Sequence, residues 1–257
     1  MTEVAQKGLL AGKVALVTGA GTGVGRAAAI GYAREGAAVA LLGRSAGTLL
    51  ETAHAIHSAG GEALVVPTDV TDESSVIAAM EAITGWKGGL DIAFNCAGTF
   101  ILSPLEEYEL SDWNAVMGLN ATGVFLGMKH EVRAMKERGG GTIVNMSSNL
   151  GAHLAAPGMV AYIASKAAVS AMTRAAAREV IGAGIRVNCI SAGPIDNPMS
   201  TRPGETAEAK AARMRSIIPL GRAGLEEEIV AAALWLSSSE SGYAVGHDML
   251  LDGGESL

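Results

Sequence analysis

The sequence predicts a single-domain α/β fold, in which helices cover both faces of a parallel sheet of about seven strands. Short apolar runs alternate with longer helical patterns along the whole chain of 257 residues, as expected for repeated strand–helix–strand units. The apolar runs are continuous, which is typical of parallel strands buried on both faces. No linker, low-complexity segment or internal repeat interrupts the alternation, so we expect one domain over residues 1–257.

The composition narrows the classes of function. Hydrophobic residues make up 49% and charged residues 18% of the chain, a balance typical of a globular protein with a sizeable core. The net charge is −7 and Lys and Arg do not cluster, which argues against nucleic acid and membrane surfaces as partners. Cys96 and Cys189 lie in separate apolar runs without C-x-x-C spacing, so we expect buried thiols and no metal site. Residues 1–8 contain no apolar signal region, and we therefore predict a cytoplasmic enzyme or binding protein.

The first predicted strand, residues 13–18, runs directly into a glycine turn, TGAGTGVG at 18–25, and then into a predicted helix at 26–35. Glycines let the backbone approach a phosphate, while the helix N-terminus supplies free N–H groups. The spacing is G-x-x-x-G-x-G instead of G-x-G-x-x-G, and a glycine turn alone could merely cap a helix. Its place between a strand and a helix favours phosphate binding. The candidate residues are Gly19, Thr22, Gly23, Val24 and Gly25.

The second predicted strand, residues 37–42, ends at Gly43-Arg44-Ser45. An acidic residue here would bind the ribose 2′-hydroxyl of NAD, and none is present. Arg44 could instead pair with a 2′-phosphate. The sequence therefore favours NADP(H) as the cofactor, with NAD(H) and a merely solvated arginine as alternatives. Ser45 is a second candidate contact in this turn.

Asp69 follows the third predicted strand, residues 62–67, which comes after a predicted helix at 46–59. It lies at a strand C-terminus, the side on which open α/β sheets bind ligands. Its carboxylate could accept a hydrogen bond from an adenine amino group. Alternatively, Asp69 or Thr71 could simply cap the next predicted helix at 74–83.

A second glycine turn, Asn95-Cys96-Ala97-Gly98, follows the fourth predicted strand at 90–94. Glycine at a strand end again suits close approach of the backbone to a cofactor. We expect residues 102–110 to be irregular and 111–138 to be a long, mainly helical stretch, interrupted weakly by Gly118 and Gly123. Asn120 lies inside that stretch, where a buried amide needs a hydrogen-bond partner.

Tyr162 and Lys166 lie four positions apart near the start of a predicted helix at 160–181, so they share one helix face. A neighbouring ammonium favours the phenolate and would bring the tyrosine pKa towards working pH. Ser148 lies just beyond the fifth predicted strand at 140–146 and offers a hydroxyl donor. Together these groups could transfer a proton to or from a carbonyl or alcohol, although Y-x-x-x-K alone could be a surface coincidence.

The C-terminal part continues the alternation. A sixth predicted strand at 185–190 is followed by the turn 191–195. Residues 197–219 show no sustained pattern before a small amphipathic part at 205–217, and we expect this segment to form a lid over the site. The last predicted elements are a helix at 226–236, which begins with three glutamates, and a strand at 249–251.

In these residues the chain resembles the short-chain dehydrogenase/reductase family in its shorter, single-domain form, which implies a Rossmann-type doubly wound sheet. The resemblance covers nearly the whole chain and rests on several motifs in the same order, which together are far more specific than any one. The motifs are the glycine turn at 18–25, Asp69-Val70, Asn95-Cys96-Ala97-Gly98, Asn120, Ser148, Tyr162 with Lys166, and LLDGG at 250–254. Ser148 matches better than Ser147, because Gly151 then falls where the family usually has a glycine.

The resemblance implies a role for each residue of the site. Tyr162 would be the general acid in reduction and the base in oxidation, and Lys166 would lower its pKa and bind the nicotinamide ribose. Ser148 would stabilise charge on the substrate oxygen, and Asn120 would hold a water that links Lys166 to solvent. The further cofactor contacts that the resemblance implies are Val70, Asn95, Ala97, Gly98, Gly193 and Ile195, in addition to Tyr162 and Lys166.

Several residues near the site depart from the family pattern. Ala192 replaces the usual proline of a Pro-Gly turn, and Asn197 stands where a threonine often contacts the nicotinamide carboxamide. Cys96 replaces the second asparagine of the Asn-Asn-Ala-Gly turn. The gap between the serine and the tyrosine is slightly longer than is common and contains His153, which would border the substrate pocket.

The sequence thus predicts a metal-free oxidoreductase that transfers hydride between a nicotinamide cofactor and a carbonyl or secondary alcohol. A nucleotide-sensing or scaffold protein on the same fold is the alternative. The pocket would be lined by 99–105, 149–159 and the lid, whose Leu, Met, Ala and Phe residues suggest an apolar substrate such as a steroid, cyclic ketone or acyl chain. The resemblance also implies a homotetramer, in which the helices at 111–138 and 160–181 pack against their copies.

Overall fold

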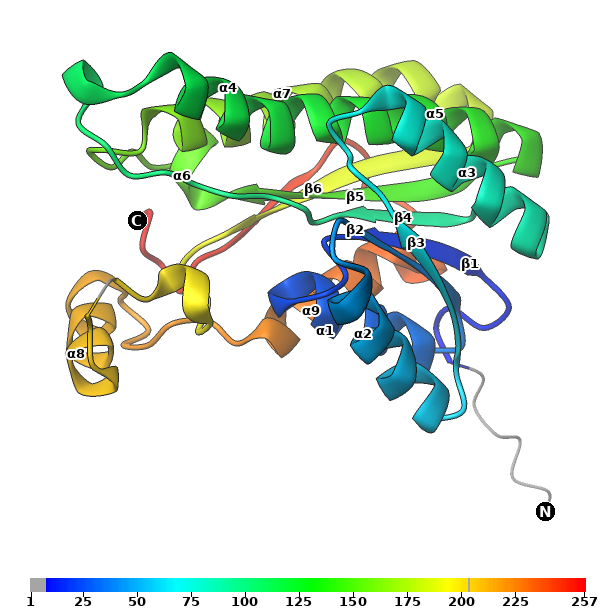
Figure 1. Cartoon of the computed structure of the whole chain (residues 1–257), viewed down its shortest axis with the longest axis horizontal. Coiled ribbons are helices and arrows are strands. Elements are labelled where there is room, and N and C mark those ends of the chain that lie inside the picture. Colours follow the sequence, from blue (N-terminus) through cyan, green and yellow to red (C-terminus); the bar gives the residue numbers. More distant parts are fainter. Residues whose placement is uncertain (1–7, 203) are drawn as a thin grey trace.

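A seven-stranded sheet forms the centre of the computed structural model, and helices cover both of its faces (Figure 1). Every pair of neighbouring strands is parallel, so the predicted Rossmann-type doubly wound α/β fold is confirmed. The structure describes residues 8–202 and 204–257. Residues 1–7, where the sequence predicts no signal region, and Pro203 of the predicted lid lie outside the described residues.

The elements follow the predicted alternation. The strands are β1 (Val14–Thr18), β2 (Ala38–Gly43), β3 (Glu62–Pro67), β4 (Ile92–Asn95), β5 (Gly141–Ser148), β6 (Ile185–Ala192) and β7 (Asp248–Leu251). The α-helices are α1 (Gly23–Arg34), α2 (Ala46–Ser58), α3 (Glu73–Lys87), α4 (Leu110–Met117), α5 (Gly123–Arg138), α6 (Asn149–Ala152), α7 (Val160–Val180), α8 (Ala207–Ile217) and α9 (Glu226–Ser237). A π-helical turn, η2 (Gly118–Thr122), joins α4 to α5, and short 3₁₀ turns lie at η1 (Leu105–Glu107), η3 (Ile181–Ala183), η4 (Pro198–Ser200) and η5 (Ser239–Ser241).

The strand order is β3-β2-β1-β4-β5-β6-β7. The side on which the chain adds new strands changes between β1 and β4, although all strands remain parallel. The chain proceeds outward from β1 through β2 to β3, then returns to place β4 on the other side of β1. The loops that follow β1 and β4 therefore diverge and leave a crevice at the carboxyl edge of the sheet. Open α/β sheets bind their ligands at this point.

Two hydrophobic layers separate the sheet from its helices. The helices α1, α2 and α9 pack on one face, and α3, α5 and α7 on the other (Figure 1). Tyr32 of α1 is fully buried, and its hydroxyl lies 2.7 Å from that of Ser237 at the end of α9. Strands enclosed by both layers have no solvent-facing side, which explains why their sequences are continuously apolar.

Three predicted boundaries differ from the structure in ways that matter for the site. Helix α1 begins at Gly23, inside the glycine turn, so its first N–H groups belong to that turn. Strand β5 continues beyond its apolar run to Ser148, because Ser147 and Ser148 pair with the end of β6. The long helical stretch breaks into α4 and α5 at η2, which contains Asn120.

The segment that carries α8 projects beyond the end of the sheet, beside the end where α6 lies (Figure 1). Thr206 caps α8 by accepting a hydrogen bond from the Ala209 N–H. Among the residues that the structure describes, no helix combines the length and apolar character needed to cross a bilayer.

Candidate active site

Two glycine turns meet where β1 and β4 lie side by side. Gly19 has a φ of 69°, and a methyl group placed on it would lie only 3.1 Å from Cα of Ala97. The Thr18 hydroxyl oxygen accepts hydrogen bonds from the backbone N–H groups of Cys96 and Ala97, at 3.0 and 3.1 Å. A methyl group on Gly25 would clash with the Gly19 carbonyl oxygen. Glycine is thus required for the close packing of the two turns in front of the α1 N-terminus, an arrangement that suits a phosphate.

A cleft of about 630 Å³ opens beside these turns. Its volume and its glycine-rich wall fit the nucleotide half of a dinucleotide. The lining residues are Gly19, Gly21, Thr22, Gly43, Arg44, Ser45, Thr48, Leu49, Thr68, Asp69, Val70, Ala97, Gly98 and Leu119. The cleft thus brings together predicted cofactor residues from four separate strand ends.

The other predicted cofactor residues lie around the cleft without lining it. Val24 and Gly25 are buried in α1, and Asn95 is buried at the end of β4. Gly193 and Ile195 follow β6, where Gly193 packs so closely on Asp252 that a methyl group would lie 2.7 Å from its Cβ.

Arg44 is exposed at the mouth of the cleft, close to Asp69. Hydrogen bonds from the Thr71 N–H and hydroxyl, at 2.9 and 2.7 Å, hold the pKa of the Asp69 carboxyl below its ordinary value, and Arg44 adds to this effect. Asp72, rather than Asp69 or Thr71, caps α3 by accepting from the Ser74 N–H. Asp69 is thus ionised and available at the cleft.

Ser148 and Tyr162 meet at the end of β5. The Ser148 hydroxyl is buried and lies 3.3 Å from the Ala192 carbonyl oxygen. Burial raises the pKa of Tyr162, while a hydrogen bond with Ser148 opposes that shift. Phe100 packs edge-on against the Tyr162 ring, with ring centroids 6.2 Å apart. The neighbouring Ser147 instead donates to the Lys166 carbonyl oxygen at 3.0 Å, so only one of the two serines faces the tyrosine.

Lys166 is buried one helical turn beyond Tyr162. Its Nζ donates to the Met146 carbonyl oxygen at 2.8 Å and lies 5.8 Å from the centre of the Tyr162 ring. Burial lowers the pKa of Lys166 to about 8. The sequence led us to expect that Lys166 lowers the tyrosine pKa, but burial has the largest effect on the pKa of both groups. The ammonium is turned towards a carbonyl oxygen, which explains the difference.

Asn120 is buried in the π-helical turn η2, on the side of Gly98. Its amide accepts from the Thr99 N–H at 2.8 Å and donates to the Thr99 carbonyl oxygen at 2.8 Å and to Ser165 at 3.0 Å. A methyl group placed on Gly98 would lie 3.3 Å from Asn120 Oδ1 and 3.4 Å from Lys166 Nζ. Asn120 therefore adjoins the lysine, but its side chain is occupied in fixing the loop after β4.

The loop between Ser148 and Tyr162 is anchored at two points. Gly151 lies against α7, where a methyl group would come within 3.0 Å of the Ala167 nitrogen. The His153 Nε2 lies 3.3 Å from an oxygen of Asp248 on β7. His153 thus contacts a strand, so a role in substrate contact stays a prediction.

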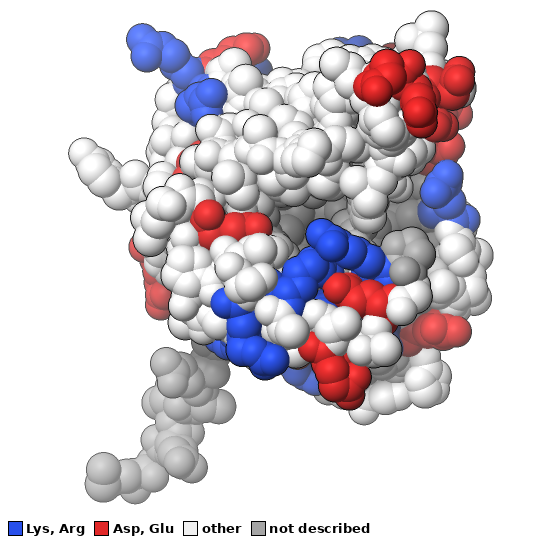
Figure 2. All heavy atoms as spheres, turned by 90° about the vertical axis from the view of Figure 1, so that its left-hand side faces the viewer, with Lys and Arg blue, Asp and Glu red and all other residues white. Residues whose placement is uncertain are grey.

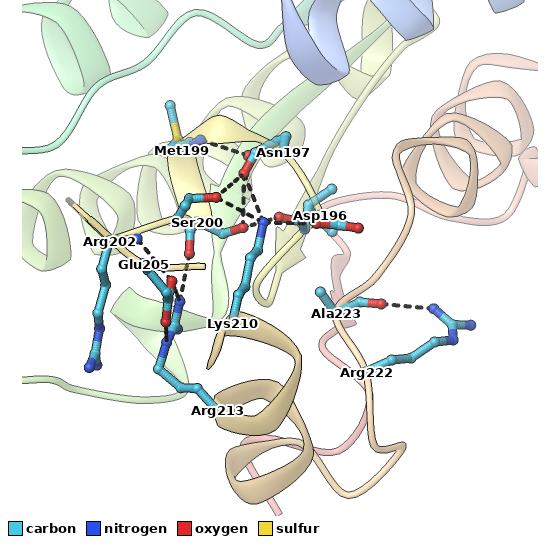
Figure 3. Close-up of polar contacts among 12 residues, drawn as sticks. Asp196, Asn197, Met199, Ser200, Arg202, Glu205, Lys210, Arg213, Arg222 and Ala223 are labelled. Atoms are coloured by element: carbon cyan, nitrogen blue, oxygen red, sulfur yellow. Dashed lines mark hydrogen bonds and ion pairs between the residues drawn. The ribbon is translucent and has the colours of Figure 1, made fainter. Parts of the chain in front are cut away.

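The predicted lid is held by two cations of α8 (Figure 3). Lys210 donates to Asp196 at 2.8 Å and to the Asn197 carbonyl oxygen at 3.1 Å. Arg213 binds both carboxylate oxygens of Glu205, each at 2.7 Å, and this pair holds the pKa of Glu205 down at about 2. Both contacts tie α8 to the chain that leaves β6.

Asn197 lies where the family's threonine would contact the cofactor. Its Oδ1 accepts from the Met199 N–H at 3.0 Å and caps η4 (Figure 3). Its amide also hydrogen-bonds to Glu226, the first residue of α9. The Asn197 side chain therefore contacts both η4 and the start of α9.

The face that carries the lid is hollowed near its centre, and Lys and Arg side chains gather at one rim of the hollow, interspersed with acidic side chains (Figure 2). The helix α8 carries three cationic residues, Lys210, Arg213 and Arg215.

Three residues at the site were not identified from the sequence. Thr48 and Leu119 line the cleft, yet each reads as an ordinary helical residue. Their only signal is position: Thr48 lies one turn beyond Ser45, and Leu119 precedes Asn120. Glu226 has no local signal, because α9 meets the glycine turn only through the tertiary fold.

The geometry defines a class of protein before any comparison: a doubly wound dinucleotide-binding fold with a serine, tyrosine and lysine beside the cleft. Comparison with known proteins agrees. The family model for enoyl-(acyl carrier protein) reductase matches residues 19–256. The chain belongs to the short-chain dehydrogenase/reductase family, whose fold implies a nicotinamide cofactor.

Three relatives illustrate the similarity. The chain is 37% identical over 249 residues to 2,5-dichloro-2,5-cyclohexadiene-1,4-diol dehydrogenase LinX of Sphingobium indicum, covering 96% of this chain and 98% of the relative. It is 39% identical over 244 residues to cis-4-hydroxycyclohexanecarboxylate dehydrogenase of Sinomonas cyclohexanicum, covering 94% and 96%. A crystal structure of a short-chain type dehydrogenase/reductase from Mycobacterium marinum superposes with a TM-score of 0.89 at 37% identity, covering 96% of each chain. These relatives support an oxidoreductase that acts on the CH–OH group of a small alcohol.

Proposed function

We propose that this protein transfers hydride between a nicotinamide dinucleotide, NADP(H) in preference to NAD(H), and a secondary alcohol or ketone on an apolar, cyclic substrate. The observation that carries the proposal is the meeting of Ser148, Tyr162 and Lys166 beside the nucleotide cleft. Both named dehydrogenases above act on hydroxylated six-membered rings. The apolar residues around the Ser148–Tyr162 loop suit such a ring.

Tyr162 and Ser148 have separate roles in the proton transfer. In alcohol oxidation, the Tyr162 phenolate takes the proton of the substrate hydroxyl, and in ketone reduction the phenol returns it. Ser148 donates a hydrogen bond to the substrate oxygen and stabilises charge on it in the transition state. The bound cofactor supplies or accepts the hydride.

Lys166 acts on both partners of the reaction. With its pKa near 8, the group is mainly an ammonium at neutral pH, and it is close enough to Tyr162 to favour the phenolate once it turns away from Met146. The same ammonium can donate to the hydroxyls of a bound ribose. Asn120 fixes the loop after β4 through hydrogen bonds with Thr99. Gly98 in this loop therefore stays close to Asn120 and to the Lys166 ammonium.

Cofactor preference rests on the turn after β2. Arg44 is the only charged side chain in the run Gly43-Arg44-Ser45, and a guanidinium binds a 2′-phosphate well. Thr48 and Ser45 offer further hydroxyl donors in the same wall of the cleft. Together they support NADP(H).

A turnover screen tests the proposal. The purified protein is incubated with NADP⁺ or NAD⁺ and a panel of cyclic secondary alcohols, and with NADPH or NADH and the corresponding ketones, while the absorbance of reduced nicotinamide is followed. We expect oxidation or reduction of at least one cyclic substrate, with faster turnover for the phosphorylated cofactor. Tight dinucleotide binding without turnover on the whole panel would favour the alternative, a nucleotide-sensing protein. That alternative draws support from the departures at Ala192 and Asn197.

We also propose that residues 197–219 form a lid, that the protein acts in the cytoplasm and that it is a homotetramer. Two apolar side chains on the helices expected to pack against a copy are exposed in the single chain: Phe125 of α5 is 50% exposed and Leu110 of α4 is 71% exposed. Sedimentation at micromolar concentration should show a tetramer, and a monomer would contradict this part of the proposal.

A further inference from the structure

Glu226 places a carboxylate next to the glycine turn. It is the first residue of α9, which packs beside α1. A methyl group placed on Gly23 would lie 3.6 Å from Glu226 Oε1 and 4.0 Å from Nδ2 of Asn197. Gly23 begins α1, so the carboxylate lies beside the N–H groups at the positive end of that helix.

The surroundings of Glu226 hold this carboxylate in a partly buried position. Burial raises the pKa of Glu226, and the neighbouring Glu227 raises it further. The hydrogen bond with Asn197 and the charge of Arg26 on α1 act in the opposite direction. Burial raises the pKa of the Cys96 thiol in the second glycine turn, and the nearby Glu226 carboxylate raises it further. Glu226 thus faces α1, the turn after β4 and the chain after β6.

We propose that Glu226 restrains dinucleotide affinity by holding an anion at the edge of the position that the cofactor diphosphate takes at the α1 N-terminus. The inference rests on the proposed function, because it assumes that a dinucleotide binds in the cleft. The Glu226 carboxylate places negative charge beside this helix end and beside the Asn197 amide. A bound diphosphate brings like charge to the same helix end, so Glu226 must turn away or take up a proton.

The proposal has a pH signature. The negative diphosphate favours the protonated form of Glu226, so binding is coupled to proton uptake in the range above the ordinary glutamate pKa of 4.5. Dinucleotide affinity should therefore increase as the pH falls towards that value. Glutamine at this position keeps the hydrogen bond to Asn197 but does not titrate, so the dependence should flatten.

Binding titrations test the proposal without any measurement of turnover. NADPH and NADH are titrated by fluorescence into the wild type, Glu226→Gln and Glu227→Gln at about pH 5.5 and about pH 8. Glu227→Gln is the matched control, because it removes the same charge from an exposed neighbour on the same helix turn. Glu226→Gln should bind both dinucleotides about tenfold more tightly at the higher pH, with a smaller gain at the lower pH, while the control should stay near the wild type. NADH, which lacks the titrating 2′-phosphate, gives the cleaner pH comparison.

Each other outcome overturns the proposal. Equal or weaker binding by Glu226→Gln would show that Glu226 serves only to orient Asn197. Equal tightening in both variants would point to net charge alone. Glu226→Asp withdraws the carboxylate by one methylene, so its dinucleotide affinity should lie between those of the wild type and Glu226→Gln. Wild-type affinity in both Glu226→Asp and Glu226→Gln would contradict the proposal. Failure of the wild type and every variant to bind either dinucleotide would overturn the proposed function as well, which separates the two failures.

Discussion

Replacing Glu131 with glutamine should stabilise the folded protein near pH 7 and remove part of its pH dependence. Glu131 lies on α5 behind the site and is 1% exposed. Its carboxyl accepts a hydrogen bond from Asn95 at 3.1 Å, and Asn95 also donates to Asn145 at 3.0 Å. Asn145 in turn donates to Thr173 at 2.9 Å. This buried chain of polar groups links β4 and β5 to α7, but Glu131 is its only acid.

The expected magnitude follows from the pKa. Burial raises the pKa of Glu131 from its ordinary value of 4.5 to about 8, and the Asn95 hydrogen bond only partly opposes this. The folded protein therefore keeps the proton where the unfolded chain releases it. The stability is fully present below the unfolded pKa and is lost as the pH rises through the window from 4.5 to about 8. At about 1.4 kcal/mol per pH unit, the loss between about pH 5 and about pH 7 is at most about 3 kcal/mol.

The assay is urea unfolding of the wild type and Glu131→Gln at a fixed protein concentration, followed by fluorescence at about pH 5, 6 and 7. The glutamine carbonyl can still accept from Asn95. The two proteins should therefore have similar unfolding free energies at the lowest pH and diverge as the pH rises. Glu137→Gln, an exposed position on the same helix, is the matched control and should follow the wild type.

Parallel pH profiles for the wild type and Glu131→Gln would refute the reasoning, because they would show that Glu131 does not titrate differently in the two states. A glutamine variant that is less stable at every pH would show that the carboxyl proton makes a hydrogen bond that the amide cannot replace.

Further predictions concern the site itself. Ser148→Ala should lower kcat by about 10²–10³-fold, the usual effect of losing one donor to a developing oxyanion, while Ser147→Ala should retain turnover because its hydroxyl faces α7; equal losses in steady-state assays would contradict this assignment. Arg44→Ala should weaken NADPH binding by about 10–100-fold, as for a lost charged hydrogen bond, and leave NADH binding nearly unchanged; equal weakening in titrations would overturn the preference. Arg213→Gln, which breaks the pair with Glu205, should speed proteolysis within 197–219 and raise KM, whereas the exposed Arg215→Gln should do neither.

The strand and helix order could be predicted from the sequence because its causes are local. The run at β1, the glycine turn and the helix after it each have their own composition, and they follow one another in the predicted order, although α1 begins earlier than predicted, inside the glycine turn. Boundaries that depend on pairing were harder to predict. Strand β5 extends through two serines because Ser191 and Ala192 of β6 lie opposite them, and neither serine favours a strand by itself.

That Tyr162 and Lys166 of the candidate site lie together could be predicted from the sequence, but the burial and hydrogen bonds that set their pKa values could not. Lys166 and Tyr162 share a helix face, as their spacing requires. Their pKa values depend instead on burial and on the Met146 carbonyl oxygen, which belongs to a distant strand. Glu226 and Gly23 are similarly remote in sequence and adjacent in space. Such contacts follow from the packing of α9 on α1, which no local pattern encodes.

The central claim is that Tyr162 transfers the proton, and Tyr162→Phe tests it most directly. Turnover of an alcohol accepted by the wild type is compared with dinucleotide affinity in the same variant. The phenyl ring keeps the edge-on contact with Phe100 and loses only the hydroxyl. We predict that turnover falls by about 10²–10⁴-fold, the usual contribution of general acid–base catalysis, while dinucleotide binding stays close to the wild-type value. Turnover at the wild-type rate in Tyr162→Phe would contradict the account.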